Sequence, residues 1–231
     1  TKEQTLGKLT ENYDGYHFSA YSPDVFNPYS LFNCFAQGKL GSYWFGSGTP
    51  TYLINMMRKY DVLPTGITRV EADESEFDAP TEDMTTLMPL LYQSGYLTIK
   101  DYNRDYNYYT LDIPNKEVKI GLTKALIPSY VTGNTLATTN TARRIAQALD
   151  KQDMDGALHL LQEFLGTVPY CNVTNHEGHY QQMLFIIFSL LTDYLVDVEV
   201  HTPKGRVDVV LLTGTDLYII ELNLDKSAQA A

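Results

Sequence analysis

The sequence has few cysteines and no long apolar run. Two cysteines, Cys34 and Cys171, occur in 231 residues, and they show no Cys-x-x-Cys spacing. This usage favours buried free thiols in a reducing compartment over a disulfide framework. No apolar stretch approaches the ~20 residues that span a membrane, and residues 1–10 are polar, unlike a signal peptide. We therefore expect a cytoplasmic protein with no membrane partner.

Basic residues are also scarce. The chain carries 17 Lys and Arg against 28 Asp and Glu, which gives a net charge of −11. Phosphate backbones attract Lys and Arg, so this balance opposes non-specific binding of duplex nucleic acid by the chain as a whole. Residues 71–83 hold seven acidic groups, one proline and few apolar residues. Such a run is typical of a solvated linker.

A phosphate-binding loop is missing as well. The pattern Gly-x-x-x-x-Gly-Lys-Ser/Thr occurs nowhere in the sequence. Residues 42–45 predict a short strand, and Gly46 to Thr49 lead from it into a helix that ends near Lys59. A helix N-terminus after glycines can bind an anion, but no lysine follows, so a tight strand-to-helix turn is the favoured interpretation. We expect no ATP site in this part of the protein.

What the sequence does contain is a hairpin near its C-terminal end. Two β-branched apolar runs surround a short turn at residues 213–216. With this turn, Leu212 faces Leu217, and the same register places Asp208 opposite Glu221. Like charges opposed across a ladder are destabilising, and a cation between them removes the repulsion. The hairpin therefore predicts a site for a divalent metal ion.

Two interpretations of this acidic pair remain open. In the first, Asp208 pairs with Arg206 or Lys204 at the hairpin edge, and Glu221 pairs with Lys226. In the second, both carboxylates hold a metal ion. We favour the second because each lies in a run of Val, Ile and Leu, where an unpaired carboxylate is costly. Oxygen ligands of this kind suit Mg²⁺ or Mn²⁺.

A helix that carries a third carboxylate precedes the hairpin. Residues 176–193 predict a helix in which Leu184, Ile187 and Glu177 share one face. The face that packs on the sheet then has Glu177 at its N-terminal end. There the carboxylate either completes the metal site or complements the helix dipole.

Three further polar residues flank these elements. His176 and His179 are three apart with no cysteine partner, so surface positions are favoured over a zinc site. Glu199 is either another neighbour of the metal or the ion-pair partner of Arg206.

The residues around the two carboxylates also carry a family resemblance. They read Gly205-Arg206-Val207-Asp208 before the turn and Glu221-Leu222-Asn223-Leu224-Asp225-Lys226-Ser227-Ala228 after it. These motifs resemble the PD-(D/E)XK nuclease superfamily, and more closely the bacterial proteins that join a predicted AAA-ATPase-like domain to such a nuclease domain. The resemblance implies Asp208, Glu221 and Glu177 as metal ligands and DNA or RNA as the partner.

One position departs from that pattern. Asn223 stands where the relatives have a lysine, and the resemblance implies that this position orients or activates the attacking water. An amide can hydrogen-bond water but carries no positive charge, so either Asn223 or a repositioned Lys226 stands near the water. Two function classes follow. One is a metal-dependent nuclease with Asp208 and Glu221 as catalytic carboxylates, and the other is an inactive relative that binds nucleic acid or protein.

The remaining segments complete a four-part prediction for a mixed α/β (α+β) chain. The phrases Tyr13-Asp14-Gly15-Tyr16, Asn27-Pro28-Tyr29-Ser30 and Tyr43-Trp44-Phe45 resemble the late part of the AAA-ATPase-like domain. We assign residues 1–68 to the C-terminal part of that domain, 84–130 to a winged-helix-like domain, 136–167 to a helical connector and 168–231 to a truncated restriction-endonuclease-like core. The relatives continue with a further strand, so the resemblance implies an open sheet edge, which favours a homodimer.

The winged-helix prediction rests on the order of elements. A helix closed by Gly95, two strands around a turn at 101–107 and a helix that begins at Asn115 follow one another. Winged helices bind DNA or serve as lids. Because nearby acids match Lys100 and Arg104, a lid or packing role is favoured.

Outside that region the sequence predicts loops and short helices. Residues 13–18 predict a turn between aromatic strands, and Asn27 caps a helix that ends near Phe35. Residues 131–140 predict a loop. Helices at about 141–150 and 154–165 follow it, the second with a core stripe of Leu158, Leu161 and Leu165.

Overall fold

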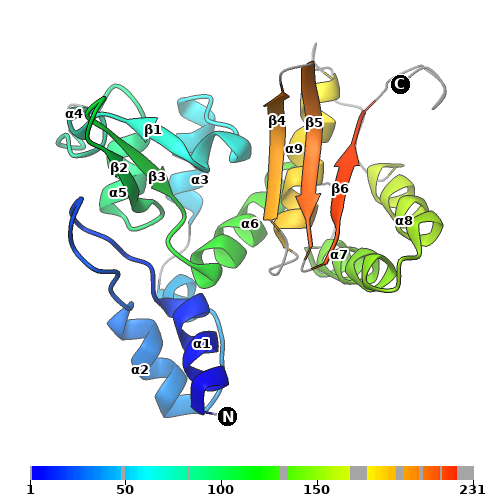
Figure 1. The fold of residues 1–231 in the computed structure, drawn as a ribbon, viewed down its shortest axis with the longest axis horizontal. Coiled ribbons are helices and arrows are strands. Elements are labelled where there is room, and N and C mark those ends of the chain that lie inside the picture. Colours follow the sequence, from blue (N-terminus) through cyan, green and yellow to red (C-terminus); the bar gives the residue numbers. More distant parts are fainter. Residues whose placement is uncertain are drawn as a thin grey trace. The chain divides into compact units, whose positions relative to one another are not determined.

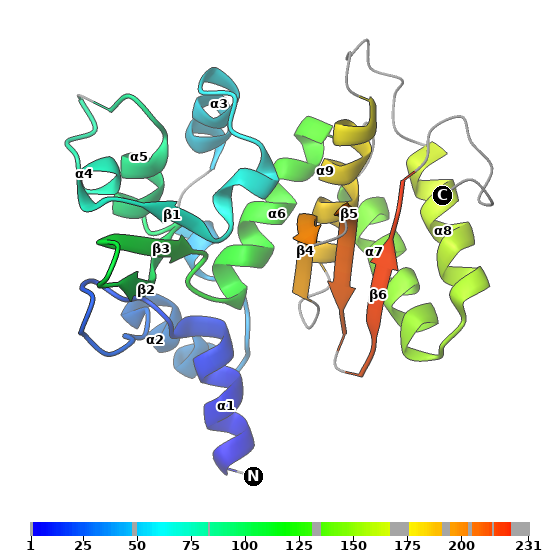
Figure 2. The same cartoon turned by 45° about the horizontal axis from the view of Figure 1, so that its top comes forward.

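The computed structural model describes residues 2–47, 50–82, 84–130, 135–166, 176–190, 195–202, 205–213 and 215–222. The chain divides into two compact units, Thr1–Ala125 and Leu126–Ala231, drawn from two directions in Figures 1 and 2. Each unit combines helices with a three-stranded antiparallel sheet, which confirms the mixed α/β class. Within the described ranges, no helix is both long and apolar enough to cross a bilayer.

Unit 1 surrounds a small sheet with short helices. Its strands are β1 (Val70–Ala72), β2 (Thr98–Asn103) and β3 (Tyr108–Asp112), in the order β1-β3-β2. Its helices are α1 (Lys2–Tyr13), α2 (Pro28–Gln37), α3 (Thr51–Lys59), α4 (Glu74–Phe77), α5 (Met88–Gln93) and α6 (Lys116–Tyr130), and α6 continues past the division between the units. Two 3₁₀ turns lie at Trp44–Ser47 and Pro64–Ile67.

Capping contacts confirm two predicted helix starts in unit 1. The side chain of Asn27 accepts a hydrogen bond from the backbone N–H of Ser30 at 3.2 Å at the start of α2. Asn115 accepts one from the N–H of Val118 at 3.1 Å at the start of α6. Each bond satisfies a backbone donor that has no partner within its helix.

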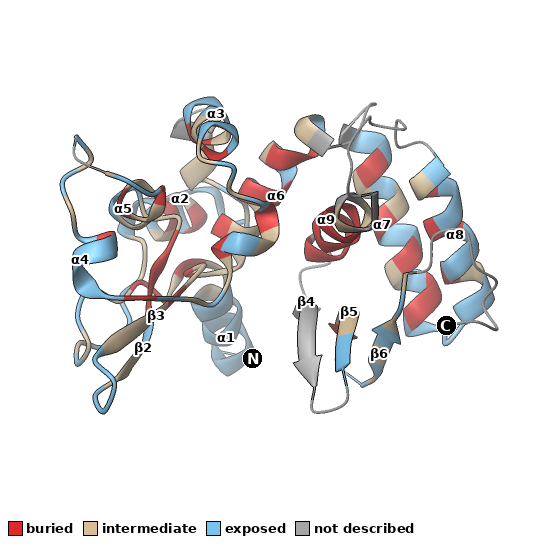
Figure 3. Ribbon diagram, turned by 90° about the horizontal axis from the view of Figure 1, so that it is seen from above, coloured by how far each residue is buried: buried red, intermediate tan, exposed pale blue. Residues whose placement is uncertain are grey.

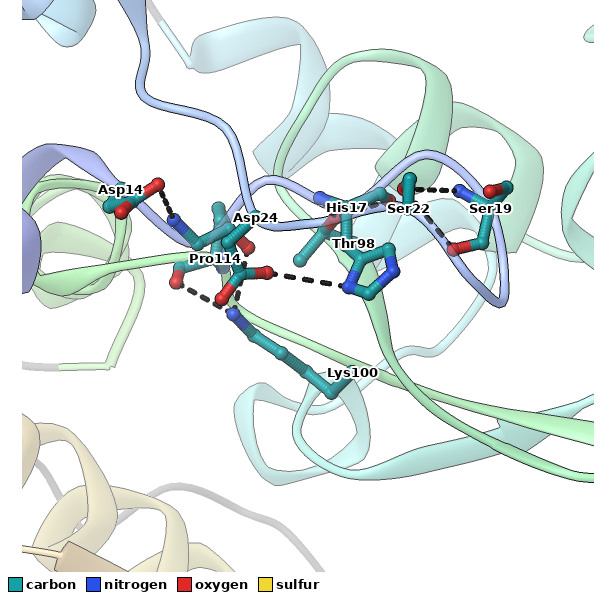
Figure 4. A network of polar contacts seen from close by, with 9 residues as sticks. Asp14, His17, Ser19, Ser22, Asp24, Thr98, Lys100 and Pro114 are labelled. Carbon is teal, nitrogen blue, oxygen red and sulfur yellow. Dashed lines mark hydrogen bonds and ion pairs between the residues drawn. The ribbon is translucent and has the colours of Figure 1, made fainter.

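A bulge in β2 turns Lys100 out of the sheet. The pairing with β3 shifts between Ile99 and Asp101, and a bulge re-aims the side chain of its extra residue. As a result, Lys100 Nζ donates to the backbone oxygens of Gly15 at 2.8 Å and Pro114 at 2.9 Å, as Figure 4 shows. Gly15 has φ +96°, and a Cβ atom there would lie 2.3 Å from the Pro114 oxygen. This position therefore requires glycine.

The predicted strand at 42–45 is wrong. Trp44 begins a 3₁₀ turn instead, because the backbone N–H groups of Tyr43 and Trp44 both donate to Glu117 Oε1 of α6, the second at 2.9 Å. Because the carboxylate accepts from these two N–H groups, they cannot donate to a neighbouring strand. The strands predicted around 13–18 are also wrong, because Tyr13 ends α1 and Tyr16 forms only an isolated bridge with Val25.

The acidic run at 71–83 is folded rather than a linker. It contributes strand β1 and helix α4, whose start is a capping box between Asp73 and Glu76. Phe77 is 2% exposed and packs edge-on against Tyr92 and Tyr109. A single buried aromatic residue thus anchors a segment whose described acidic side chains are exposed.

Unit 2 places helices over a second sheet. Its strands are β4 (Leu195–Thr202), β5 (Gly205–Leu212) and β6 (Leu217–Ile220), in that order across the sheet. Its helices are α7 (Thr135–Asp150), α8 (Met154–Gly166) and α9 (His176–Ser189). Figure 3 shows α9 and α7 on one side of the strands, with α9 buried from Gln181 to Ser189. Because α9 contacts β4, β5 and α7, its burial extends well beyond the single stripe that the sequence predicted.

Two helical predictions in unit 2 need correction. α7 begins at Thr135, so the predicted loop at 131–140 is wrong over its second half. Thr138 is buried, so the buried face of α7 begins before residue 141. In α8 the buried residues are Ala157, Leu160, Leu161 and Phe164, whereas Leu158 is 45% exposed.

Candidate functional site

The β5–β6 hairpin has the register that the sequence predicts. Leu212 pairs with Leu217, and the ladder continues to the pair Val209–Ile220. The paired register ends there, and the position of Asp208 opposite Glu221, one step beyond the end of β6, stays a prediction. Backbone N–H of Thr213 donates to the oxygen of Asp216 at 2.9 Å and closes the turn. If the register continues by one residue, strand alternation predicts the two acidic residues on the same face of the hairpin.

Asp208 is the buried carboxylate of this hairpin. It is 5% exposed and lies between apolar neighbours of β5. Gln181 Nε2 of α9 donates to Asp208 Oδ1 at 3.1 Å, and the backbone N–H of Leu222 donates to Oδ2 at 2.8 Å. The two bonds come from different elements, so they fix the orientation of the carboxylate relative to both the helix and the strand end.

Neither bond neutralises Asp208. Both donors are neutral amides, and among the described residues the carboxylate contacts the cation Arg206, whose guanidinium lies 3.8 Å from Oδ1. Arg206 is on the same strand, two residues earlier, and its side chain is 45% exposed. The predicted pairing of Asp208 with Arg206 is therefore present, but at the outer limit of an ion pair and open to solvent screening.

The donor chemistry fits a hard divalent cation. An ionised carboxylate has about four lone-pair positions, and the two hydrogen bonds occupy one on each oxygen. Each oxygen thus keeps acceptor capacity for an ion of the Mg²⁺ or Mn²⁺ type. Glu221, which is exposed, directly follows Ile220 at the end of β6. Among the described residues, no three His, Cys, Asp or Glu side chains are grouped closely enough to hold a metal.

Several predicted site residues fall outside what the structure describes. Asn223 and Lys226 lie outside the described residues, as does Lys204, the alternative partner of Asp208. The backbone of Glu177 belongs to the first turn of α9, but its side chain lies outside the described part. The side chains of His176, His179 and Glu199 also lie outside it. Their predicted roles stay predictions.

Gln181 is the site residue that the sequence did not reveal. It is 2% exposed and stands beside Gln182, 6% exposed, at the point where α9 becomes fully buried. Buried glutamines in an apolar helix need hydrogen-bond partners. Two adjacent amides before the run Met183-Leu184-Phe185-Ile186 were therefore a usable signal for a polar contact with the sheet.

Comparisons with known proteins agree with this location. Residues 175–231 match the sequence profile of the PD-(D/E)XK nuclease superfamily. Over 219 residues, the chain is 28% identical to an "uncharacterized protein in vnfD 5'region" of Azotobacter chroococcum mcd 1. The alignment covers 92% of this chain and 42% of that relative, so the chain spans less than half of the relative's length. No solved structure matches the chain.

Proposed function

We propose that residues 175–231 form a metal-dependent site for phosphodiester hydrolysis of the PD-(D/E)XK type, centred on Asp208. The observation that supports this most is the state of the Asp208 carboxylate. It is buried and oriented by two neutral donors, and the cation that the described residues bring to it is the partly exposed guanidinium of Arg206 at 3.8 Å. Burying a carboxylate in this way is costly unless something compensates it, and a bound cation would supply the compensation.

The ligands in this proposal are Asp208, Glu221 and Glu177, and the ion is Mg²⁺ or Mn²⁺. When bound, such an ion polarises a scissile phosphate and lowers the pKa of a coordinated water. Gln181 and the N–H of Leu222 would hold Asp208 in its orientation. Arg206, with its exposed guanidinium, is suited to a phosphate oxygen of the substrate. A cation near the attacking water would have to come from Lys226, because Asn223 is neutral.

The proposal extends to the rest of the chain through the motifs in unit 1. We propose that residues 1–68 belong to the C-terminal part of an AAA-ATPase-like domain and that 84–130 form a winged-helix-like lid. The relative from Azotobacter is long enough to contain the remainder of such a domain. On this view, DNA or RNA is the substrate of the C-terminal site, and a homodimer would form through the edge of its sheet.

A second candidate function is that of an inactive relative that binds nucleic acid or protein. Asn223 in place of the motif lysine and the net charge of −11 favour it. The two candidates differ in metal binding and cleavage, so one experiment can separate them.

The test is a calorimetric titration with Mn²⁺, combined with cleavage of plasmid and single-stranded DNA. We expect weak saturable binding of Mn²⁺, and Asp208→Ala should abolish the heat. Asp216→Ala is the matched control, because Asp216 lies in the same hairpin at its turn. Binding lost equally in both variants, or no saturable heat from folded protein in millimolar metal, would contradict the metal site. Binding without any cleavage would leave the inactive relative as the function.

A further inference from the structure

Unit 1 contains a cavity of about 460 Å³ whose lining includes five aromatic residues. Tyr16, Phe18, Trp44 and Tyr92 are among its lining residues, as is Gly95. Ligand pockets in proteins typically measure ~300–1,000 Å³ and combine apolar walls with a few polar groups. The cavity is independent of residues 175–231, so it is unrelated to the proposed metal site.

Three sequence phrases that had no assigned role converge on this cavity. Tyr16 belongs to the first phrase, Asn27 and Pro28 to the second and Trp44 to the third, and all four residues line the cavity. They come from segments up to 28 positions apart that have no sheet in common. A shared pocket is a physical reason for these separate phrases to occur in one chain.

Polar contacts hold the walls in place before any ligand binds. Glu117 fixes the backbone of Trp44 at 2.9 Å. Thr98, which lines the cavity, accepts from the N–H of His17 at 2.7 Å and donates to its carbonyl at 2.9 Å, so the chain between Tyr16 and Phe18 is fastened to β2 (Figure 4). A preformed pocket of this kind loses less conformational entropy on binding.

The surroundings of the cavity carry negative charge. Residues 70–99, which supply Tyr92 and Gly95, contain seven acidic residues and no Lys, Arg or His. Burial raises the pKa of the Tyr92 phenol, and the nearby carboxylates of Asp78 and Glu74 add to the effect. Residues 18–38 contribute Asp24, but its carboxylate lies 3.4 Å from His17 Nδ1 and near the ammonium group of Lys100, and Arg104 donates to Tyr21 Oη at 3.0 Å. The negative charge that the proposal uses is therefore that of Glu74 and Asp78 near Tyr92.

The rim offers apolar surface to a partner. Phe18 is 66% exposed and Val25 is 45% exposed, although both line the cavity. Phe18 also stacks on Tyr16, with ring planes 12° apart. Exposed aromatic side chains beside a hollow are typical of places where a partner inserts a large apolar group.

We propose that this cavity binds a large apolar side chain of a partner polypeptide whose flanking residues are Lys or Arg. The aromatic walls bury the apolar side chain, and the acidic groups of α4 attract the basic flanks. The same charges repel phosphate groups, so a nucleotide or single-stranded nucleic acid is disfavoured even though bases stack on aromatic rings.

Trp44 provides the measurement, since it is the one tryptophan of the chain and lines the cavity. Its fluorescence is followed in the whole 231-residue chain during titration with the peptide acetyl-Lys-Lys-Phe-Lys-Lys-amide. We expect a saturable change, with affinity about 10- to 100-fold higher than for the same peptide with Ala in place of Phe. The peptide with Glu in place of every Lys should bind more weakly still at low salt.

Two pairs of variants separate the pocket from the general surface. Phe18→Ala should weaken binding of the Lys-Phe peptide about fivefold or more, since it removes a wall of the pocket. Phe35→Ala is its matched control, because Phe35 is 60% exposed on α2 and does not line the cavity. Glu74→Gln combined with Asp78→Asn should weaken the same peptide at low salt, whereas Glu3→Gln on exposed α1 should not. Val25→Ala is a second wall variant, used if Phe18→Ala fails to fold.

Several outcomes would overturn the proposal. One is the absence of a saturable Trp44 signal with any of the peptides, and another is equal loss of affinity in Phe18→Ala and Phe35→Ala. Tighter binding of oligo-dT or ATP than of the Lys-Phe peptide, measured in the same way, would assign the cavity to nucleic acid or nucleotide instead.

Discussion

Among the described residues, one carboxylate in each unit is deeply buried, and the two are held in different ways. Glu117 in unit 1 is 1% exposed, and both of its hydrogen bonds come from adjacent backbone N–H groups to a single oxygen, Oε1. Its other oxygen, Oε2, is buried without a hydrogen-bond partner. Asp208 in unit 2 is 5% exposed, and its two bonds come from a helix side chain and a strand end, one to each oxygen.

The two carboxylates therefore have different roles. Glu117 fixes the conformation of the backbone, whereas Asp208 is held with both oxygens oriented for a further contact. One oxygen of Glu117 accepts the hydrogen bonds that residues 43 and 44 would donate within a sheet. The chain there forms a 3₁₀ turn instead. Asp208 ends no helix and closes no turn. Its contacts instead set the direction of a carboxylate that keeps acceptor capacity on both oxygens, beside a guanidinium at 3.8 Å. Burial alone therefore does not identify a functional acid, and the distribution of its hydrogen bonds is more informative.

The largest effect that would sharpen this comparison concerns Asn223. If Asp208 is a metal ligand, a positive charge beside it should promote cleavage, because a lysine stabilises the developing negative charge of the transition state. We expect Asn223→Lys to raise the rate of DNA cleavage with Mg²⁺ or Mn²⁺ by about 10²–10³, which is the usual size for one such group. Gel assays of plasmid nicking measure this directly. If the unaltered protein already cleaves DNA at full rate and Lys226→Ala abolishes the cleavage, then Lys226 takes the role of the motif lysine.

The next effect tests the structural role of Glu117. Glu117→Ala leaves the N–H groups of Tyr43 and Trp44 without an acceptor, and each buried unpaired donor costs ~1–3 kcal/mol. We expect the free energy of unfolding of unit 1 to fall by about 3 kcal/mol in urea, followed by Trp44 fluorescence. Glu117→Gln keeps an acceptor oxygen and should lose about 1 kcal/mol. Mn²⁺ binding should be the same in both variants, and a loss of it would break the distinction between the two carboxylates.

The same two residues show how far the sequence leads. The register of the β5–β6 hairpin was predictable, because strand alternation and the turn length fix which residues face each other. The helix starts at Asn27 and Asn115 were predictable from local capping chemistry. These signals all act over a few residues of chain.

Contacts between distant residues were not predictable in this way. Glu117 reaches Tyr43, 74 positions earlier, and converts an apparent strand into a turn. Gln181 reaches Asp208 across 27 positions. The acidic run was misinterpreted for a related reason, because the burial of Phe77 against Tyr92 and Tyr109 outweighs the solvation of its charged neighbours. In each case tertiary packing overrides a correct local preference.

A smaller effect should come from Gln181, which orients the proposed metal ligand without touching the ion. Gln181→Leu keeps a similar volume but removes the donor to Asp208 Oδ1. Loss of such a supporting contact typically weakens metal binding ~10- to 100-fold, and we expect a change near the lower limit for Mn²⁺ by calorimetry. Ser189→Ala is the matched control, since Ser189 is buried on the same helix and its hydroxyl has no hydrogen-bond partner. Equal Mn²⁺ affinity in Gln181→Leu and the unaltered protein would show that Leu222 alone positions Asp208.

The smallest effect concerns Lys100, which we expect to be structural like Glu117. Burial lowers the pKa of Lys100 from its ordinary value of 10.5, although Asp24, Asp112 and Asp14 act in the opposite direction. Between the lowered pKa of the folded state and 10.5, the unfolded chain binds more protons than the folded chain, so this group makes the protein more stable as pH rises through that window.

This contribution of Lys100 to the free energy of unfolding is absent in Lys100→Met. The difference in unfolding free energy between the unaltered protein and Lys100→Met should therefore increase between pH 8 and about pH 10.5 in urea titrations. Tyr13 and Tyr16, whose pKa values burial raises to about 12, are present in both proteins and cancel in the difference. Lys8→Met on exposed α1 controls for the loss of one positive charge. A difference that shrinks with rising pH would mean that the charge of Lys100 stabilises the fold. Unit 1 would then contain a cation paired with its acids rather than one held by its two carbonyl bonds alone.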